Sequence, residues 1–329
     1  MPTSLPRLWT DASLHPAAVA VLRGHVQLSG PHVPANEAAA SPFGMAGADA
    51  VMAGPRGFYN AASFASAPAL KVIARTGIGY DNIDLSAATA AGVCVVNTPD
   101  APTESTAEFA LTLMFAVSRR VATADLNSKA GLWKQDATVL GFELADKNLG
   151  LVGFGRIARR VAEVARALRM RVHAFDPFVP AAQMSAVGVT ACATLPDLLR
   201  ISQVLSLHAP STADTRRLIG AGQLALLPAG AILINTARGP LIDDLAVLAA
   251  LNEGRLAGAG IDVWETEPVA PDHPLFRHPR VVATPHIAAY TEEARYRSHV
   301  AAAELILMAL SGEPPATLID PSVWPRRRR

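Results

Sequence analysis

The stretch Gly153-Phe154-Gly155-Arg156-Ile157-Ala158 decides the fold of this chain. It lies between a short apolar run at 149–152 and a helix-like run at 157–168, so the sequence predicts a strand, a glycine turn and a helix. Residues without a Cβ let the backbone approach a pyrophosphate closely, and the N-terminus of the next helix presents N–H groups to the phosphates. Alanine at the third position of this fingerprint still allows close packing of helix and strand. The stretch therefore predicts a dinucleotide-binding βαβ unit.

The next predicted strand, 171–175, ends at Asp176. A carboxylate about 20 residues after the glycine turn is where the ribose hydroxyls of an adenosine bind. The pair Asp176-Pro177 also favours a turn, which is the structural alternative for this residue. We expect Asp176 to accept hydrogen bonds from the ribose, and its charge to favour NAD over NADP.

Length and composition narrow the class of protein. A chain of 329 residues suggests two domains, and 50% apolar with 17% charged residues allows a large core. The net charge of +1 argues against a nucleic-acid partner. The only basic cluster, residues 326–329, is expected to be a solvated, frayed terminus. No apolar stretch approaches the ~20 residues that span a bilayer, so no membrane partner is expected.

Cysteine usage and the N-terminus indicate the compartment. Cys94 and Cys192 lie in apolar, strand-like contexts, which is typical of buried thiols in a reducing compartment rather than of a disulfide or a metal site. The N-terminus lacks a charged start followed by a long apolar run, so no signal peptide is expected. We therefore expect a cytoplasmic protein without a metal.

Strands and helices alternate after Gly153, which predicts a doubly wound parallel sheet. The expected later strands are 203–207, 231–234, 257–261 and 281–283, and the expected helices are 222–227 and 243–253. Sheets of this kind bind ligands at the carboxyl ends of their strands. A glycine or a polar residue stands at or just past the end of each predicted strand: Gly153, Asp176, His208, Arg238, Asp262 and His286.

The first hundred residues predict a smaller, separate α/β unit with strands at 50–52, 72–74 and 93–97. A helix is expected over 105–122, where Ser105 and Glu108 fit a capping box. Its apolar residues cover more than one face, so the helix either packs on a partner subunit, which predicts a homodimer, or is enclosed in its own domain. A last helix, 291–310, would return the chain to the first unit.

Three polar segments follow three of the later strands and carry the candidate chemistry. The first holds Arg238, which can bind a substrate carboxylate through two parallel N–H bonds. The third holds His286, which can give or take a hydroxyl proton. A carboxylate beside a histidine favours its protonated form and fixes its orientation. Such a set suits the reduction of a 2-oxo acid, although a single histidine among nine is as often structural.

The motifs resemble those of the D-isomer-specific 2-hydroxyacid dehydrogenases from about Val72 to about Ile319. They are Gly77-Ile78-Gly79-Tyr80-Asp81-Asn82-Ile83-Asp84, Asn97-Thr98-Pro99, Ser105-Thr106-Ala107-Glu108, Gly150-Leu151-Val152-Gly153-Phe154-Gly155-Arg156-Ile157, Leu207-His208-Ala209-Pro210, Asn235-Thr236-Ala237-Arg238-Gly239, Asp262-Val263-Trp264-Glu265-Thr266-Glu267-Pro268 and Thr284-Pro285-His286-Ile287-Ala288. The resemblance implies a Rossmann NAD-binding domain, 99–289, inserted in a flavodoxin-like substrate-binding domain made of 1–98 and 290–329.

The resemblance also implies roles for individual residues. Arg238 would bind the substrate carboxylate and carbonyl, Glu267 would support the histidine, and His286 would be the acid/base. The backbone at Ile78 and Gly79 would hold the substrate carboxylate, with a plain glycine turn as the alternative. Asp262 would hold the nicotinamide amide. Further NAD contacts would come from Gly153, Phe154, Gly155, Arg156, Ile157, Asp176, His208, Pro210, Thr236 and Ala237.

Asp100 and Trp133 resemble the glyoxylate/hydroxypyruvate reductase branch, and other motifs are similar to phosphoglycerate dehydrogenases, so a glyoxylate- or hydroxypyruvate-like substrate is expected. Members of the reductase branch often carry an arginine for NADPH where this chain has Asp176. Tyr290 stands where small residues are common and either narrows the pocket or touches substrate.

Two alternatives stay open. A formate dehydrogenase-like enzyme would use the same sheet, but such enzymes have glutamine in place of Glu267. An NAD-sensing interaction protein, similar to corepressors of the same superfamily, would retain the three catalytic groups. The absence of a long extra tail or a basic surface argues against it.

Overall fold

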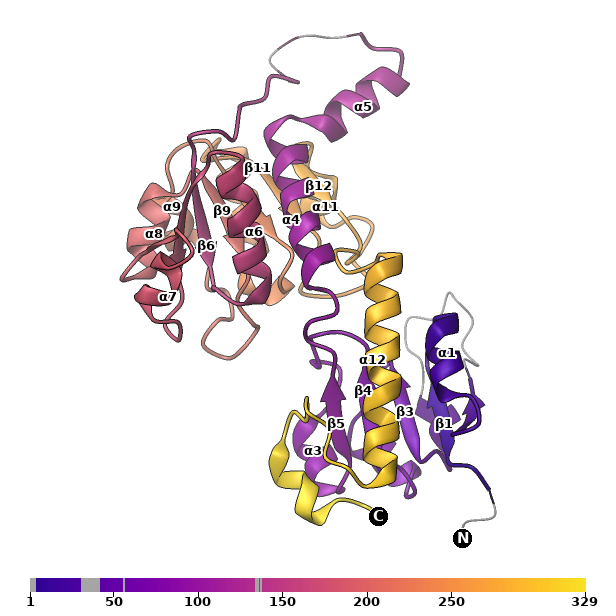
Figure 1. Ribbon diagram of the computed structural model, residues 1–329. Helices are drawn as coiled ribbons and strands as arrows, with labels where there is room; N and C mark the ends of the chain where they lie inside the picture. Colours follow the sequence, from indigo (N-terminus) through magenta and orange to yellow (C-terminus); the bar gives the residue numbers. More distant parts are fainter. Residues whose placement is uncertain (1–3, 31–41, 56, 134–135, 137) are drawn as a thin grey trace. The chain divides into compact units, whose positions relative to one another are not determined.

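The computed structural model describes residues 4–30, 42–55, 57–133, 136 and 138–329. Residues 1–3, which begin the N-terminus for which no signal peptide was expected, lie outside the described residues. The chain forms two compact units, Met1–Pro102 with Tyr290–Arg329, and Thr103–Ala289. Each is built on a parallel sheet with helices against it, which confirms the predicted α/β class (Figure 1).

The unit Thr103–Ala289 contains a seven-stranded parallel sheet of order β12-β11-β10-β9-β6-β7-β8. Its strands are β6 Asn148–Val152, β7 Arg171–Phe175, β8 Thr190–Ala191, β9 Val204–Leu207, β10 Ala231–Asn235, β11 Leu256–Ile261 and β12 Val281–Ala283. All of them except the short β8 were predicted to within about two residues. The strand order reverses between β6 and β9, which is the switch point where such sheets bind ligands.

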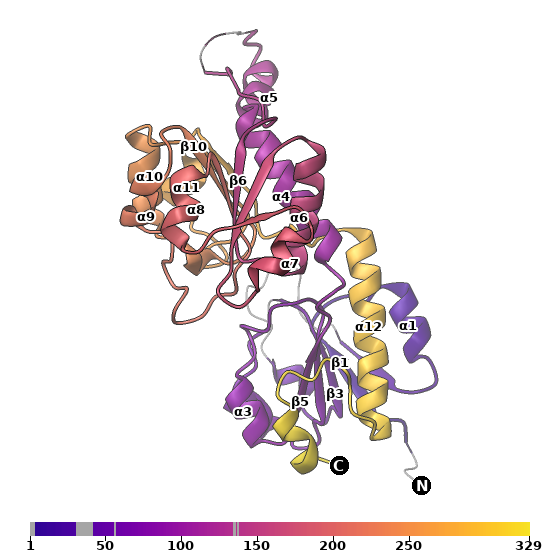
Figure 2. The same ribbon diagram turned by 60° about the vertical axis from the view of Figure 1, so that its left-hand side comes forward.

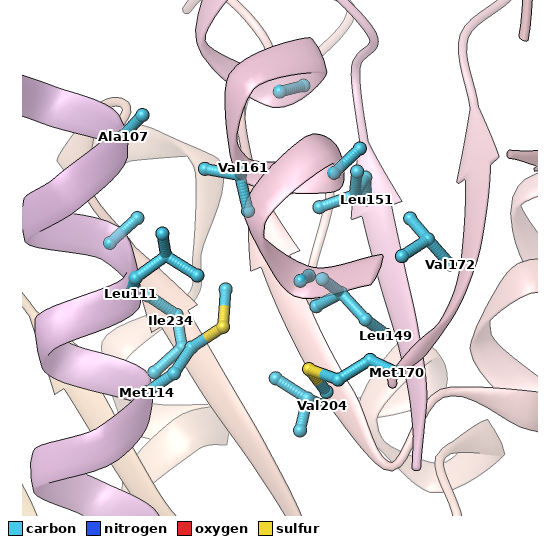
Figure 3. Packing of buried hydrophobic residues seen from close by; sticks show 14 of the residues in the cluster. Ala107, Leu111, Met114, Leu149, Leu151, Val161, Met170, Val172, Val204 and Ile234 are labelled. Carbon is cyan, nitrogen blue, oxygen red and sulfur yellow. The ribbon is translucent and has the colours of Figure 1, made fainter. Parts of the chain in front are cut away.

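Helices cover both faces of this sheet because strand side chains alternate between the faces. The helices are α4 Thr103–Ser118, α5 Val121–Lys129, α6 Arg156–Ala167, α7 Ala181–Ser185, α8 Leu195–Ile201, α9 Ala221–Leu226, α10 Asp244–Asn252 and α11 Pro274–Arg277, with a 3₁₀ turn at Gly239–Leu241. Helices α4 and α6 pack together over one face, and α4 also contacts β10 and β11. Figure 3 shows this core, with Leu111 and Met114 of α4 lying near Ile234.

The helix predicted over 105–122 is wrong at both ends. Helix α4 begins at Thr103, so Ser105 is buried within the first turn and the predicted capping box does not form. Arg120 adopts a left-handed conformation with φ 54°, which ends α4 and separates it from α5. None of the residues of α5 is buried, and this helix projects away from the sheet of its own unit (Figures 1 and 2).

The other unit contains a five-stranded parallel sheet of order β2-β1-β3-β4-β5, the flavodoxin-like order. Its strands are β1 Arg7–Thr10, β2 Gln27–Ser29, β3 Ala50–Ala53, β4 Val72–Arg75 and β5 Cys94–Asn97. Its helices are α1 Pro16–Leu22, α2 Ala61–Ser66, α3 Leu85–Ala90 and α12 Glu292–Ser311, with 3₁₀ turns at Pro42–Met45 and Pro321–Arg326. The predicted return helix is confirmed as α12, which packs against α1 and β4 (Figure 1).

The C-terminal arginines are not frayed, so that prediction is wrong. The Arg328 guanidinium donates to the carbonyls of Ala67 at 2.7 Å and Leu70 at 3.3 Å. The backbone N–H of Arg328 donates to Gly92 at 2.9 Å. The last carbonyls of a helix lack intrahelical partners, and Nη2 of Arg328 donates to one of them in α2, the carbonyl of Phe64, at 3.4 Å.

Cys94 is buried in β5 and Cys192 follows β8, and both thiols are free. In the described ranges, no group of three potential metal-ligating side chains occurs. No described helix is both long enough and apolar enough to cross a membrane.

Candidate active site

The glycine turn after β6 is shaped by its neighbour β9. Gly153 has φ 88°, and a Cβ there would lie 2.8 Å from the carbonyl oxygen of His208, so no side chain fits. Gly155 is the N-cap of α6, which has no side-chain cap. A Cβ at Gly155 would meet nothing within 4 Å, so there is open space beside the backbone where the helix begins. This geometry suits a pyrophosphate, as predicted for the turn.

Asp176 is tied to the same turn. Its Oδ2 accepts from the N–H of Phe154 at 2.8 Å, and its Oδ1 accepts from the N–H of Phe178 at 2.8 Å. A carboxylate has about four acceptor positions, so each oxygen can still accept a ribose hydroxyl. The side chain of Phe154 is buried in the core, so this predicted cofactor residue presents only its backbone. Arg156 is exposed and Ile157 is partly buried at the start of α6.

Two residues at the strand ends offer polar groups without a charge. His208 follows β9, and its Nε2 lies 2.9 Å from Oγ of Ser206. Burial lowers the pKa of His208 to about 4, so its imidazole is neutral near pH 7. Thr236 follows β10, and its buried Oγ1 has no hydrogen-bond partner in the described part of the chain. Because buried polar atoms are nearly always bonded, this hydroxyl fits a bound ligand such as NAD.

A histidine and a carboxylate meet at the same edge of the sheet. Nδ1 of His286 lies 2.7 Å from Oε2 of Glu267, and Oε1 of Glu267 accepts from the N–H of Trp264 at 3.0 Å. The His286 side chain is 40% exposed, so Nε2 remains for a substrate. Burial raises the pKa of Glu267, but the bonds from His286 and Trp264 and the charge of Arg238 outweigh it, and the pKa lies below its ordinary value.

Arg238 is brought to this pair by the packing of two loops. A Cβ at the following residue, Gly239, would lie 2.0 Å from the backbone of Trp264, so only glycine allows the contact. Nη1 of Arg238 donates to the carbonyl of Ala237 at 2.6 Å. Asn235, which is fully buried, donates through Nδ2 to the carbonyl of Arg238 at 2.9 Å. No role of its own was predicted for Asn235, although a polar residue that ends an apolar strand could have indicated one.

Asp262 accepts hydrogen bonds from the loop that carries His286, a role that was not predicted from the sequence. Its fully buried carboxylate accepts from Oγ1 of Thr284 at 2.6 Å and from the N–H groups of Ile287 at 2.9 Å and Ala288 at 2.8 Å. The N–H of His286 donates to the Asp262 carbonyl at 2.8 Å. These bonds surround His286, whose φ is 54°, so Asp262 fixes the backbone that carries the imidazole.

The remaining predicted residues lie in the loops that follow three strands, β9, β10 and β4. Pro210 is exposed in the loop after β9, and its carbonyl accepts from Oγ1 of Thr215 at 2.7 Å. Ala237 donates through its N–H to Oδ1 of Asn235 at 3.1 Å. Ile78 and Gly79 follow β4 in the flavodoxin-like unit.

A family profile described as "D-isomer specific 2-hydroxyacid dehydrogenase, NAD binding domain" matches residues 111–288. A D-3-phosphoglycerate dehydrogenase of Archaeoglobus fulgidus is 42% identical over 78% of this chain, and the chain spans 48% of that relative's length. A glyoxylate reductase of Aeropyrum pernix is 41% identical over 78% of each chain.

A solved structure has the same fold. The TT0316 protein of Thermus thermophilus matches with a TM-score of 0.86 and 36% identity, covering 95% of this chain and 100% of that one.

Proposed function

Because the chain belongs to the D-isomer-specific 2-hydroxyacid dehydrogenase family, we propose that it reduces a 2-oxo acid to a D-2-hydroxy acid with NADH, and catalyses the reverse oxidation. The observation that carries this proposal is the 2.7 Å contact between His286 and Glu267. It lies at the carboxyl edge of the sheet that also holds the glycine turn, which is where a Rossmann sheet binds its ligands.

In this proposal, the cofactor when bound supplies a hydride to the carbonyl carbon. His286 donates a proton from Nε2 to the carbonyl oxygen, on which negative charge grows. Glu267 accepts the hydrogen bond from Nδ1, which orients the ring and favours the imidazolium. Arg238 binds the substrate carboxylate and stabilises the charge on the oxygen until the proton arrives. The N–H groups at Ile78 and Gly79 bind the same carboxylate.

The residues proposed to hold NAD fit that molecule by their chemistry. The open N-terminus of α6 suits the pyrophosphate, and Asp176 suits the adenosine ribose. The unpaired hydroxyl of Thr236 and the neutral ring of His208 suit the uncharged parts of the cofactor. Asp262 is proposed for the nicotinamide amide, next to the bonds it already makes. The turn residues 153–157, Pro210 and Ala237 complete the set.

We propose glyoxylate or hydroxypyruvate as the substrate type. Asp100 and Trp133 support this choice by their resemblance to the reductase branch. The similarity to a curated glyoxylate reductase over 78% of both chains supports it further. The similarity to phosphoglycerate dehydrogenases makes 3-phosphohydroxypyruvate the competing substrate.

The test is NADH oxidation with glyoxylate, hydroxypyruvate, pyruvate, phenylpyruvate and 3-phosphohydroxypyruvate, followed by the loss of NADH absorbance. We expect a kcat of roughly 1–10³ s⁻¹ with the best acid. NADH binding without turnover of any acid would favour the NAD-sensing alternative. NAD reduction by formate in the same assay would favour the formate dehydrogenase-like alternative.

We also propose that the protein is a homodimer, but through a different surface from the one first expected. Most of the apolar side chains of α4 are buried in its own unit. The exposed apolar side chains instead lie on α5 and the segment after it, which we call the arm: Val121, Leu126, Leu132, Trp133 and Leu140. Several large exposed apolar side chains on one segment are typical of an interaction surface, and the proposed occupant is a second copy of this chain.

A further inference from the structure

Two consecutive backbone N–H groups follow strand β4. They belong to Ile78 and Gly79, and no hydrogen-bond partner for either exists within the described residues. The peptide carbonyls next to these groups, in contrast, are both bonded. The N–H of Thr98 donates to the Gly77 carbonyl at 3.0 Å, and Nδ2 of Asn97 donates to the Ile78 carbonyl at 2.8 Å.

The pairing of these groups follows from the planarity of the peptide bond. In a trans peptide, the C=O of one residue and the N–H of the next lie in one plane and point in opposite directions. The Gly77 carbonyl shares its plane with the N–H of Ile78, and the Ile78 carbonyl shares its plane with the N–H of Gly79. The residues that hold the two carbonyls therefore also set the direction of the two N–H groups.

Further contacts make this arrangement rigid. Oγ1 of Thr98 accepts from the N–H of Gly77 at 2.8 Å, so Thr98 holds Gly77 from both sides. Asn97 and Thr98 are 7% and 3% exposed, which restricts their side chains. Oγ1 of Thr317, in the C-terminal segment, donates to the Asn97 carbonyl at 2.6 Å. A residue of the C-terminal segment, Thr317, thus fixes the backbone at the end of β5.

We propose that Asn97 and Thr98 are positioning residues that aim the N–H groups of Ile78 and Gly79 at the substrate carboxylate, with Thr317 supporting Asn97. This inference rests on the proposed function, in which that carboxylate binds here. Neither residue touches substrate. Their effect is on the binding of the acid, so it is distinct from the proton transfer at His286.

The test compares Thr98→Val, which keeps the shape but loses the acceptor for Gly77, with Thr98→Ser, which keeps the acceptor. Asn97→Leu removes the donor to the Ile78 carbonyl. The matched control is Thr89→Val, because Oγ1 of Thr89 donates to Asp320 at 2.8 Å and ties the same C-terminal segment without reaching this loop. For each variant, kcat, the KM for glyoxylate and the KM for NADH are measured, together with amide hydrogen exchange of the peptide around 76–80 without substrate.

We expect Thr98→Val and Asn97→Leu to raise the KM for glyoxylate roughly tenfold or more, the effect of losing a well-aimed bond to a charged group. The KM for NADH should not change. Exchange around 76–80 should be faster in both variants and near wild type in Thr98→Ser and Thr89→Val. If Asn97→Leu does not fold, the Thr98 pair decides the question.

Failure of this inference is distinguishable from failure of the proposed function. Wild-type protein that reduces no 2-oxo acid overturns the proposed function and, with it, a substrate role for this loop. Wild-type activity with an unchanged KM in Thr98→Val, or with the same rise in Thr89→Val, overturns the positioning role alone.

Discussion

In the proposed reaction, the bond between Nδ1 of His286 and Glu267 determines which ring nitrogen can meet the substrate. With Nδ1 occupied, only Nε2 can transfer a proton. The left-handed backbone of His286 would be costly by itself, and the bonds to Asp262 stabilise it. A single buried carboxylate and a single partly exposed one thus set the position and the orientation of the imidazole.

Replacing the imidazole should separate chemistry from cofactor binding. His286→Ala is expected to lower kcat by roughly 10²–10⁴, because it removes the proposed proton donor. NADH binding, followed by the fluorescence of the reduced nicotinamide, should be nearly unaffected. A variant with near-normal kcat and a normal pH profile would show that the proton donor is another group.

Removing the carboxylate charge should move the pH profile. The pKa of Glu267 lies below its ordinary value in part because of its hydrogen bond with His286. Glu267→Gln should therefore make the reductive kcat fall off at a lower pH than in wild type, since the imidazolium loses its anionic partner. Glu265→Gln, two residues away and paired with Arg216, is the matched control. Identical profiles for wild type and Glu267→Gln would contradict the assignment.

We expect one residue, Asp176, to determine the choice between NADH and NADPH. A 2′-phosphate in contact with the Asp176 carboxylate should cost NADPH binding on the order of 1–4 kcal/mol, so kcat/KM should clearly favour NADH. Because Asp176 also holds the N–H of Phe154, Asp176→Ala should weaken NADH binding as well as relax the discrimination. The measurement is kcat/KM for both cofactors, and equal values in wild type would contradict this role.

At the scale of elements, two helices, α4 and α5, have the two roles that were predicted for a single helix over 105–122. Helix α4 completes the core of its own unit, and the arm beyond Arg120 exposes apolar side chains. The left-handed residue at the junction turns the chain away from the core and makes this division possible.

The arm provides a test of the proposed homodimer. Leu126 is 68% and Trp133 is 89% exposed, and we expect a second copy of the chain to cover them. Light scattering of wild type at micromolar concentration should give about twice 34.4 kDa, and Leu126→Ser combined with Trp133→Ser should shift the mass toward one chain. Leu245→Ser, at a site 75% exposed on α10, is the control that should stay dimeric. An active wild-type monomer would exclude this surface as the dimer contact.

At the scale of the whole chain, two histidines join segments that are 284 residues apart. The N–H of His15 donates to Nδ1 of His299 at 2.9 Å, and Nε2 of His15 lies 2.9 Å from Glu292. Burial, with the charges of Arg295 and His15, lowers the pKa of His299 to about 4. The bond from His15 requires that Nδ1 of His299 be unprotonated, so it links the start of α1 to α12 only while that ring is neutral.

This link predicts how stability depends on pH. The unfolded chain binds a proton at His299 near pH 6.5 and the folded chain only near pH 4, so stability is full above pH 6.5 and falls as the pH drops toward 4. The loss should be on the order of 3 kcal/mol. His299→Asn keeps an acceptor but does not titrate, so its melting temperature should fall less over this range. Parallel pH profiles for the two proteins would contradict the prediction.

Several features could be predicted from the sequence because they depend on local pattern. Apolar runs of strand length, separated by helical periodicity, indicated the parallel sheet. In a parallel sheet all carboxyl ends share one edge, so residues such as Asp176, Arg238 and His286 could be placed there together. The first seventy residues were predicted less well, because their Ala- and Pro-rich composition gives short strands such as β1 and β2 little periodicity.

Only the tertiary structure decided the features that depend on distances between segments remote in sequence. The bonds that Thr284 and Ala288 donate to Asp262, and those that Arg328 donates to the carbonyls after α2, have no signal in the sequence of either partner alone. The turn at Arg120 could not be predicted from the sequence either, because arginine does not indicate a left-handed conformation. Composition and periodicity report what a residue prefers next to its chain neighbours, whereas a hydrogen bond across the fold is determined by packing that brings two otherwise ordinary segments within about 3 Å.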